Sequence, residues 1–229
     1  SDCVHLAEEA NWPPFTLESG GMASKGFSWE LAQLVFTRMG RCAEVELLPM
    51  QRLLLSARQG TRDGITLISL NPERASFLAY TSPPVMTRRA FVYQRQDSAP
   101  IAMNSWDDLR GLNVAIVRGR NYPQAFQQAR EQGTFRVMEV VAASQMFELL
   151  LRGRIDALLS LDMEAAEFLA QPLYQGKIVP SAKPYLESDY YLAISRQSPL
   201  VQSLPEINQA ITELQFNGQL PALLQRYGL

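Results

Sequence analysis

An arginine near the start of a predicted helix is the residue whose position points most directly to chemistry. In Asn71-Pro72-Glu73-Arg74, Asn71 suits a helix N-cap and Pro72 the first helical position, which places Arg74 in the first turn. A cation there is unfavourable by about 0.3 kcal/mol or more, because the helix dipole makes that end positive. Arg74 is either an exposed side chain that tolerates this cost or part of an anion site. We prefer a site for a carboxylate.

An aromatic residue held by prolines follows the first predicted strand. Trp12 precedes Pro13-Pro14-Phe15, and the prolines restrict the loop so that the indole stays at the end of the strand. Phe15 is expected in the core, whereas Trp12 suits the wall of a binding cleft at least as well. Glu9, three residues before Trp12, offers a carboxylate to a ligand ammonium group.

The second half of the chain contains a similar junction. Residues 118–123, RGRNYP, join a predicted strand to a predicted helix whose first backbone N–H groups are free. An anion held between this loop, with Arg120 and Asn121, and Arg74 would keep the two halves closed. Asp162 follows a later strand of the same half, where it either caps a helix or contacts the ligand.

Motifs for metal, phosphate and nucleophilic chemistry are absent from the sequence. His5 is the only histidine and lies in the first predicted strand, so a structural role is favoured. There is no HExxH, no phosphate-binding GxxxxGK[ST] and no GxSxG. Carboxylates are plentiful, so acid–base catalysis stays open, but nothing requires it. We expect no metal, no cofactor and no enzymatic activity.

Length and charge limit the class of protein. With 229 residues, 47% of them hydrophobic, the chain can form one large domain or two lobes of about 100 residues each. A net charge of −2 shows no basic bias towards nucleic acid or anionic lipid, and no apolar run is long enough to span a membrane. The chain begins at Ser1 without an apolar signal core, as a secreted protein does after processing and as an excised fragment does.

The candidate residues lie between alternating helices and strands, a pattern typical of an open α/β sheet. The first half predicts helices over 28–39 (capped by Ser28), over 51–59 and from Asn71, with strands over 42–48, 65–68 and 90–95. The second half predicts helices over 106–110, 123–131, 201–216 and 219–226, one from Ser144 to Gly153 and one capped by Asp162. Its strands are predicted over 113–117, 135–141, 155–159 and 190–195.

An internal sequence repeat predicts two lobes. The motif GTRD at 60–63 precedes the apolar strand ITLISL, and GRID at 153–156 precedes ALLSL. We predict two facing α/β lobes, residues 1–92 with 190–229 and residues 93–189, joined by the strands 90–95 and 190–195. Ligands of such sheets lie beyond the carboxyl ends of the strands, which in a two-lobed protein is the cleft between the lobes.

The two cysteines suit a disulfide. Cys3 and Cys42 stand at the starts of the predicted strands 3–7 and 42–48, which one helix joins. In a right-handed βαβ unit such strands are parallel and can be neighbours, which brings their first residues within reach. The alternative is two buried thiols, but the positions favour a Cys3–Cys42 bridge and an oxidising compartment.

Taken together, these motifs resemble the family 3 periplasmic solute-binding proteins, the amino-acid-binding group of ABC importers. The resemblance covers nearly the whole chain and lies in the order and spacing of short motifs: WPPF at 12–15, GFSWEL at 26–31, GTRD at 60–63, PER at 72–74, YTSP at 80–83, DLRG at 108–111, GRIDA at 153–157, and the ending NG at 217–218 to YG at 227–228. It implies a two-lobed, type II α/β fold in which each lobe is an open, mostly parallel sheet flanked by helices.

The resemblance also implies roles for individual residues. Arg74 matches the arginine that grips the ligand carboxylate, and Trp12 matches the aromatic residue that covers the ligand. Ser69 matches a hydroxyl residue that meets the ligand amino group, and Asn121 a residue beside the carboxylate. Glu9 matches an acidic position present in some members.

The sequence departs from the family pattern at the ammonium site. The usual ligand aspartate position is Leu161 here, and the nearest acid is Asp162. The segment between Asp63 and Arg74 is one residue shorter than usual. PMQR at 49–52 resembles a divergent branch, in which Arg52 either reaches the cleft or only starts a helix.

Together these features predict a monomeric periplasmic receptor that delivers a small amino-acid-like or carboxylate-bearing ligand to the permease of an ABC transporter. The first alternative is the same fold serving as the extracellular sensor domain of a membrane receptor. The second is an enzyme similar to cyclohexadienyl dehydratases, with Glu164 as the candidate acid by position. A first-turn helix glutamate favoured by the dipole is the plainer interpretation of Glu164.

Overall fold

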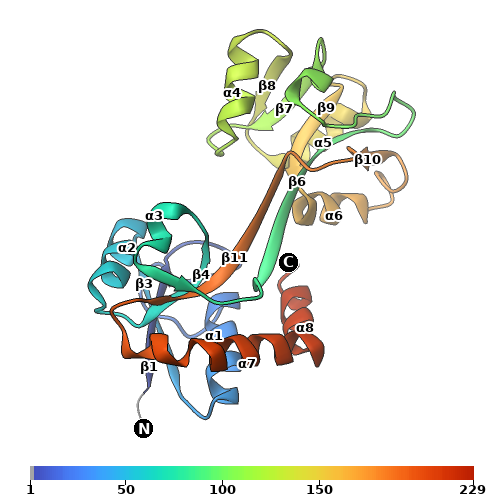
Figure 1. Cartoon of the computed structure of the whole chain (residues 1–229). Helices are drawn as coiled ribbons and strands as arrows, with labels where there is room; N and C mark the ends of the chain where they lie inside the picture. The colour runs from blue at the N-terminus through green and yellow to red at the C-terminus, as the bar shows by residue number, and fades with distance from the viewer. Residues whose placement is uncertain (1–2) are drawn as a thin grey trace. The chain divides into compact units, whose positions relative to one another are not determined.

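The computed structural model describes residues 3–229 and divides the chain into two compact units. Unit 1 contains the chain up to Thr87 together with Asp189–Leu229, and unit 2 contains Arg88–Ser188. The chain passes from one unit to the other twice, within strands β6 (Met86–Arg95) and β11 (Leu186–Ser195) (Figure 1). Each unit combines a sheet with flanking helices, which confirms the predicted two-lobed α/β fold.

The sheet of unit 1 is built mainly from parallel strands. Its order is β2-β3-β1-β4-β11, and the short β5 pairs with β11. β1 lies between β3 and β4 and is parallel to both, whereas β2 and β11 are antiparallel. The bounds are β1 Val4–Glu9, β2 Gly21–Met22, β3 Ala43–Leu48, β4 Gly64–Ser69 and β5 Leu78–Tyr80.

Alternating side chains of β1 bury both faces of this sheet. Val4 and Leu6 join an apolar cluster with α1, whereas Ala7 joins a cluster with α2 on the other face. The helices of unit 1 are α1 (Phe27–Arg38), α2 (Met50–Gln59), α3 (Pro72–Ala75), α7 (Leu204–Phe216) and α8 (Gln219–Arg226), with a 3₁₀ turn, η2, at Pro199–Ser203. α7 and α8 pack against α1 (Figure 1).

Unit 2 repeats the plan with fewer strands. The order is β6-β9-β7-β8, with β10 on β6; β7 is parallel to β8 and β9, and β6 is antiparallel to β9. The bounds are β7 Asn113–Val117, β8 Arg136–Val140, β9 Ala157–Leu161 and β10 Ile178–Pro180, with η1 Trp106–Leu109, α4 Gln124–Glu131, α5 Ala143–Leu151 and α6 Asp162–Leu169. α5 and α6 supply one apolar cluster of this unit, and η1 and α4 supply another.

Three predicted helix caps are wrong, each by one or two residues. α1 begins at Phe27 after Gly26, so Ser28 lies buried in the first turn. α5 begins after Ala142 rather than at Ser144, and it ends at Leu151. Strand β9 runs on to Leu161, so Asp162 is the first residue of α6 and not its cap. Ser and Asp favour helix starts, but the length of the preceding strand or turn decides which residue occupies the cap.

Two other local predictions are confirmed. The Asn71 side chain accepts a hydrogen bond from the Arg74 backbone N–H at 2.8 Å, with Pro72 in the first position, although α3 is only one turn long. Gly60 ends α2 in the left-handed conformation that glycine adopts without strain. The predicted helix 201–216 is divided into η2 and α7, with Pro205 in the first turn of α7.

Among residues 3–229, no helix is both long enough and apolar enough to cross a membrane.

The predicted disulfide is confirmed. Cys3 and Cys42 are bonded, with their Cα atoms 4.6 Å apart. Each precedes a strand by one residue, and the parallel register of β1 and β3 sets Val4 opposite Ala43. The bond therefore links the amino ends of two neighbouring strands, as the βαβ argument predicts.

We predict that opening the Cys3–Cys42 bond weakens the folded state. The bridge closes a loop of 39 residues, and the chain-entropy estimate for a loop of that size is about 4 kcal/mol. Urea unfolding of the protein with Cys3→Ala and Cys42→Ala should show about that loss in the free energy of unfolding. Thiol titration of the denatured, unreduced parent protein should find no free thiol, and two free thiols would contradict the bridge.

Candidate functional site

Arg74 lies at the carboxyl end of β4. Its Nη1 atom donates to the Ser69 hydroxyl at 3.0 Å and to the Ser69 carbonyl oxygen at 3.3 Å. Its backbone N–H is already bound by Asn71, so that amide is not free for an anion. The guanidinium is thus oriented by the last residue of a buried strand, which holds the charge in a defined place.

The hydrogen-bond partners of the Arg74 side chain are uncharged. Tyr80 donates its hydroxyl to the Ser69 carbonyl oxygen at 2.9 Å and packs edge-on against Tyr191. Burial raises the pKa of Tyr80, and the charge of Arg74 acts in the opposite direction. Among residues 3–229, no carboxylate lies within ion-pair distance of the Arg74 guanidinium. A partly buried cation without an acid nearby can accept an anion.

Trp12 is held in a short, hydrogen-bonded loop. Asn11 adopts the left-handed conformation, which asparagine tolerates better than most residues. The Trp12 backbone N–H donates to the Thr16 hydroxyl at 3.0 Å, and that hydroxyl donates to the Glu9 carbonyl oxygen at 2.6 Å. The indole packs against Phe15, with ring centroids 4.2 Å apart.

One strand pairing brings Trp12 close to the end of β4. The Trp12 ring centroid lies 6.0 Å from that of Tyr190, and Tyr190 is the register partner of Ser69 in the β4–β11 ladder. Glu9 is the partly buried last residue of β1, the parallel neighbour of β4. Four predicted site residues, Glu9, Trp12, Ser69 and Arg74, therefore gather around the carboxyl ends of adjacent strands in unit 1.

Arg120, in unit 2, is fully engaged by an acid. Its two terminal nitrogens donate to the two oxygens of Glu164 at 2.9 and 2.7 Å, and the Ser160 hydroxyl donates to Glu164 at 2.9 Å. The hydrogen bonds to Glu164 raise the pKa of Arg120. In contrast to Arg74, Arg120 already carries a counter-charge, so a ligand anion would compete with Glu164 for it.

Aromatic side chains surround this ion pair. Tyr122 accepts the Val117 backbone N–H at 3.0 Å, and Tyr185 packs against Trp106. Burial raises the pKa of both tyrosines. Asn121, between Arg120 and Tyr122 in the sequence, is exposed. The pair and its tyrosines form a second polar cluster, entirely within unit 2.

Asp162 occupies the first position of α6. Its carboxylate accepts its neighbour's N–H, that of Met163, at 2.8 Å. Burial raises the pKa of Tyr93 to about 12, and the negative charge of Asp162 adds to the shift. Leu161, at the family's usual aspartate position, is the last residue of β9. The structure therefore has a leucine at the end of β9 where the family usually has its ligand aspartate.

The sequence-based site omitted several residues that the structure places beside it. Tyr80 and Tyr190 contact the unit 1 residues, and Ser160 and Tyr185 lie with the unit 2 pair. Strand register positions Tyr190 opposite Ser69, and no short motif encodes that register. Tyr80 begins the YTSP segment of the family resemblance, which could have drawn attention to it, but its hydroxyl contact with Ser69 is tertiary.

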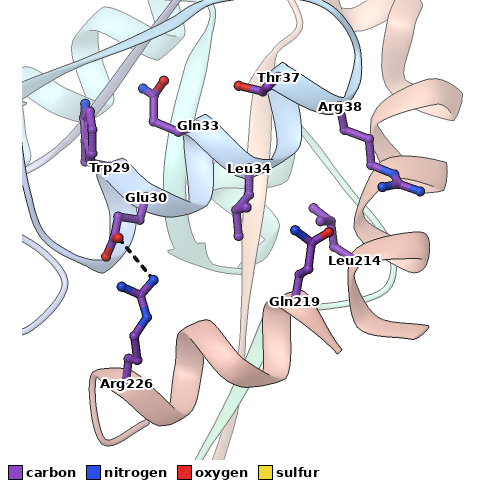
Figure 2. A pocket seen from close by; sticks show the side chains of 9 residues that line it. All are labelled: Trp29, Glu30, Gln33, Leu34, Thr37, Arg38, Leu214, Gln219 and Arg226. Atoms are coloured by element: carbon purple, nitrogen blue, oxygen red, sulfur yellow. Dashed lines mark hydrogen bonds and ion pairs between the residues drawn. The ribbon is translucent and has the colours of Figure 1, made fainter. Parts of the chain in front are cut away.

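A groove on unit 1 lies among other helices. It has a volume of about 430 Å³ and is lined by residues of α1, α7 and α8, among them Trp29, Leu34 and Leu214 (Figure 2). Charged side chains at its rim pair with one another, since Glu30 binds Arg226 at 3.1 Å. None of the predicted ligand residues lines it.

Metal binding has no support in the described part of the chain. Residues 3–229 contain no group of three or more histidine, cysteine, aspartate and glutamate side chains that could hold an ion. His5 is exposed, with its Nδ1 atom 3.1 Å from a Glu44 oxygen. Arg52 is also exposed, in the first turn of α2.

Two named proteins are similar in sequence to nearly the whole chain. The virulence sensor protein BvgS of Bordetella pertussis is 25% identical over 224 residues, which cover 93% of this chain but only 17% of BvgS. The L-cystine-binding protein TcyJ of Escherichia coli K12 is 23% identical over 220 residues, which cover 96% of this chain and 80% of TcyJ.

Solved structures give the same result for the fold. The unliganded, open L-cystine solute receptor of Neisseria gonorrhoeae superposes with a TM-score of 0.72 at 18% identity, covering 98% of this chain and 92% of that receptor. The sequence model of the bacterial extracellular solute-binding proteins, family 3, matches residues 4–229. With the fold, the motifs and this match in agreement, the chain belongs to family 3 of the bacterial extracellular solute-binding proteins.

Proposed function

We propose that this chain binds a small amino-acid-like ligand by its carboxylate, and that Arg74 is the residue that holds it. The observation that carries the proposal is the charge of Arg74. Its guanidinium is partly buried and oriented by Ser69, yet no acid within residues 3–229 neutralises it. A ligand carboxylate can bind a guanidinium through two parallel hydrogen bonds, which makes this residue type well suited to the role.

The other unit 1 residues suit the rest of an amino acid. Trp12 offers an aromatic face for the ligand's apolar part, and Glu9 and the Ser69 hydroxyl offer acceptors for an ammonium group. We propose that unit 1 supplies the ammonium site, because Leu161 replaces the usual aspartate of unit 2. Arg120, Asn121 and Asp162 are proposed to complete the site when unit 2 closes on the ligand.

The class of ligand is supported by relatives. TcyJ and the Neisseria receptor are named for L-cystine, which carries two carboxylates and two ammonium groups. A ligand of that type would offer one carboxylate to Arg74 and a second to Arg120 in exchange for Glu164. L-Cystine and related amino acids are therefore the first compounds to titrate.

Two biological settings fit the same binding chemistry. We propose delivery of the solute from the periplasm to an ABC importer, and the name of TcyJ, an L-cystine-binding protein, supports the binding half of that role. The alternative is a sensor domain, which the likeness to BvgS favours, although the chain spans only 17% of that protein. Ligand-dependent stimulation of a reconstituted permease's ATPase would support delivery, and its absence with a bound ligand would favour sensing.

We predict that Arg74→Ala weakens ligand binding while leaving the fold intact. Breaking a charge pair in a binding site typically costs about 2 kcal/mol or more, which is about a 30-fold rise in Kd. Arg74→Lys should recover only part of the loss, because an ammonium cannot bind a carboxylate bidentately. Isothermal titration with a panel of amino acids, including L-cystine, measures the effect, and melting curves check the fold.

Arg58→Ala is the matched control for that experiment. Arg58 is an exposed arginine of the same unit, 3.5 Å from Glu73, and a surface pair of this kind contributes little. Its variant should bind like the parent protein. If Arg74→Ala also bound like the parent, Arg74 would not be the carboxylate ligand.

We predict that ligand binding makes the protein more compact. The chain passes between the units within β6 and β11, and such connections permit hinge closure around a ligand. Small-angle scattering at a saturating concentration of the amino acid should give a smaller radius of gyration than the unliganded protein. An unchanged radius, with binding confirmed by calorimetry, would show that the site is rigid.

We predict no dehydratase activity. A general acid must present a proton to its substrate, but both oxygens of Glu164 accept hydrogen bonds from Arg120. Incubation with prephenate or arogenate should therefore yield no aromatic product above the uncatalysed rate. Formation of phenylpyruvate or phenylalanine that Glu164→Gln abolishes would overturn the assignment as a binding protein.

A further inference from the structure

Glu8 is a carboxyl group buried in the core of unit 1. It is the penultimate residue of β1, and its exposed fraction is 1%. Side chains alternate along a strand, so Glu8 points to the same face as Val4 and Leu6, towards the apolar cluster that contains α1. An acid in such a place is uncommon unless it has a partner or a purpose.

The groups that face Glu8 are hydrogen-bond donors without charge. One carboxyl oxygen accepts the Glu9 backbone N–H at 2.8 Å, and the other accepts the Ser28 hydroxyl at 3.3 Å. The Leu67 backbone N–H of β4 is a third donor. Within residues 3–229 no lysine, arginine or histidine pairs with Glu8.

The nearby ionisable groups are on two elements. Glu9, on β1 itself, is the charge that acts on Glu8. Glu30, one turn into α1, is paired instead with Arg226 and with the Tyr227 hydroxyl. β4 presents a backbone amide, and Leu47 of β3 is the register partner of Glu8. Among residues 3–229, the charge that acts on Glu8 in this site is therefore of the same sign.

Glu8 also lies where hydrogen bonds attach the Trp12 loop to α1. The Ser28 backbone N–H donates to the Phe15 carbonyl oxygen at 2.9 Å, and the Phe27 N–H donates to the Pro14 carbonyl oxygen at 3.2 Å. The first turn of α1 therefore has two partners here. Its backbone N–H groups bind the loop, and its Ser28 hydroxyl binds Glu8. The Glu9 N–H bound by Glu8 is where the loop begins. A charge on Glu8 would act directly on this attachment of the loop to α1.

We propose that Glu8 is a positioning residue, whose carboxyl oxygens tie the end of β1 to the first turn of α1 and so hold the segment 9–16, with Glu9 and Trp12, in place. When Glu8 ionises, a negative charge appears in the apolar site beside Glu9, and the segment loosens. The ligand-binding consequence, a weaker hold on an amino acid at high pH, rests on the proposed function. The positioning itself does not.

The direction of the pH effect follows from burial. Burial raises the pKa of Glu8 to about 8, the hydrogen bonds from Glu9, Leu67 and Ser28 oppose the rise, and the charge of Glu9 adds to it. The folded state therefore keeps a proton that the unfolded chain loses near its ordinary pKa of 4.5. Stability falls as the pH rises from about 4.5 to about 8 and then levels off. The loop should respond at the upper end of that window.

The test uses the protein without ligand. Tryptophan emission, with the Trp12 contribution identified by comparison with Trp12→Phe, is followed from about pH 6 to about pH 10, a range that includes the transition of a buried acid. Hydrogen exchange of the segment 9–16 is measured at both ends of the range. We expect a transition with a midpoint near pH 8. Above it, the segment should exchange faster than the general base-catalysed rise in amide exchange accounts for.

Three variants assign that transition. Glu8→Gln, which cannot ionise, should abolish it. Glu9→Gln removes the like charge and should lower the midpoint, whereas Ser28→Ala removes a donor to the carboxylate and should raise it. If Glu8→Gln does not fold, the opposite shifts of the other two variants still test the proposal.

A transition that persists in Glu8→Gln, or that does not move in either neighbouring variant, would overturn the role of Glu8. The absence of any transition in the parent protein would do the same. Because neither measurement needs a ligand, these outcomes are independent of whether an amino acid binds at Arg74.

Discussion

The parallel pairing of β1 with β4 is the constraint on which the candidate site depends. Leu6 is paired with Gly64 and Ala7 with Ile65, so the two strands end on the same side of the sheet. Glu9 ends one strand, and Ser69 ends the other. The Trp12 loop and the Arg74 turn follow directly in the chain. Residues more than 50 positions apart in the sequence therefore lie at the same end of the sheet, although their side chains do not bond directly to one another.

Strand β11 pairs antiparallel with β4 and adds a third strand at this end of the sheet. Tyr190 stands opposite Ser69 and contacts the Trp12 ring, so the aromatic loop and the arginine turn are connected through a strand from the far end of the chain. This strand also carries the chain between the units. Any change in the direction of β11 would therefore act on both the aromatic and the charged side of the site.

Charge is distributed unequally between the two units. Arg74 is oriented by a hydroxyl, and no carboxylate of residues 3–229 lies within ion-pair distance of it, whereas Arg120 is bound bidentately by Glu164. A partly buried charge without a counter-ion costs free energy, and a ligand that supplies the opposite charge recovers that cost. Glu8 shows the other solution to the same problem, because a buried acid with no cation lowers its energy by keeping its proton.

The sequence by itself determined the fold class, the order of the longer helices and strands, the Asn71 cap, the Gly60 stop and the disulfide, but it did not predict the short strands β2, β5 and β10. These depend on local patterns or on the handedness of one βαβ unit, which hold whatever the rest of the chain does. It misplaced the caps at Ser28, Ser144 and Asp162, because the end of the preceding segment is set by packing. Only the tertiary structure decided that no carboxylate in the described part of the chain pairs with Arg74, that Glu164 neutralises Arg120, and that Glu8 is buried next to Ser28. Each of these is a contact between distant segments, and its energy depends on strand register and burial, which no local pattern records.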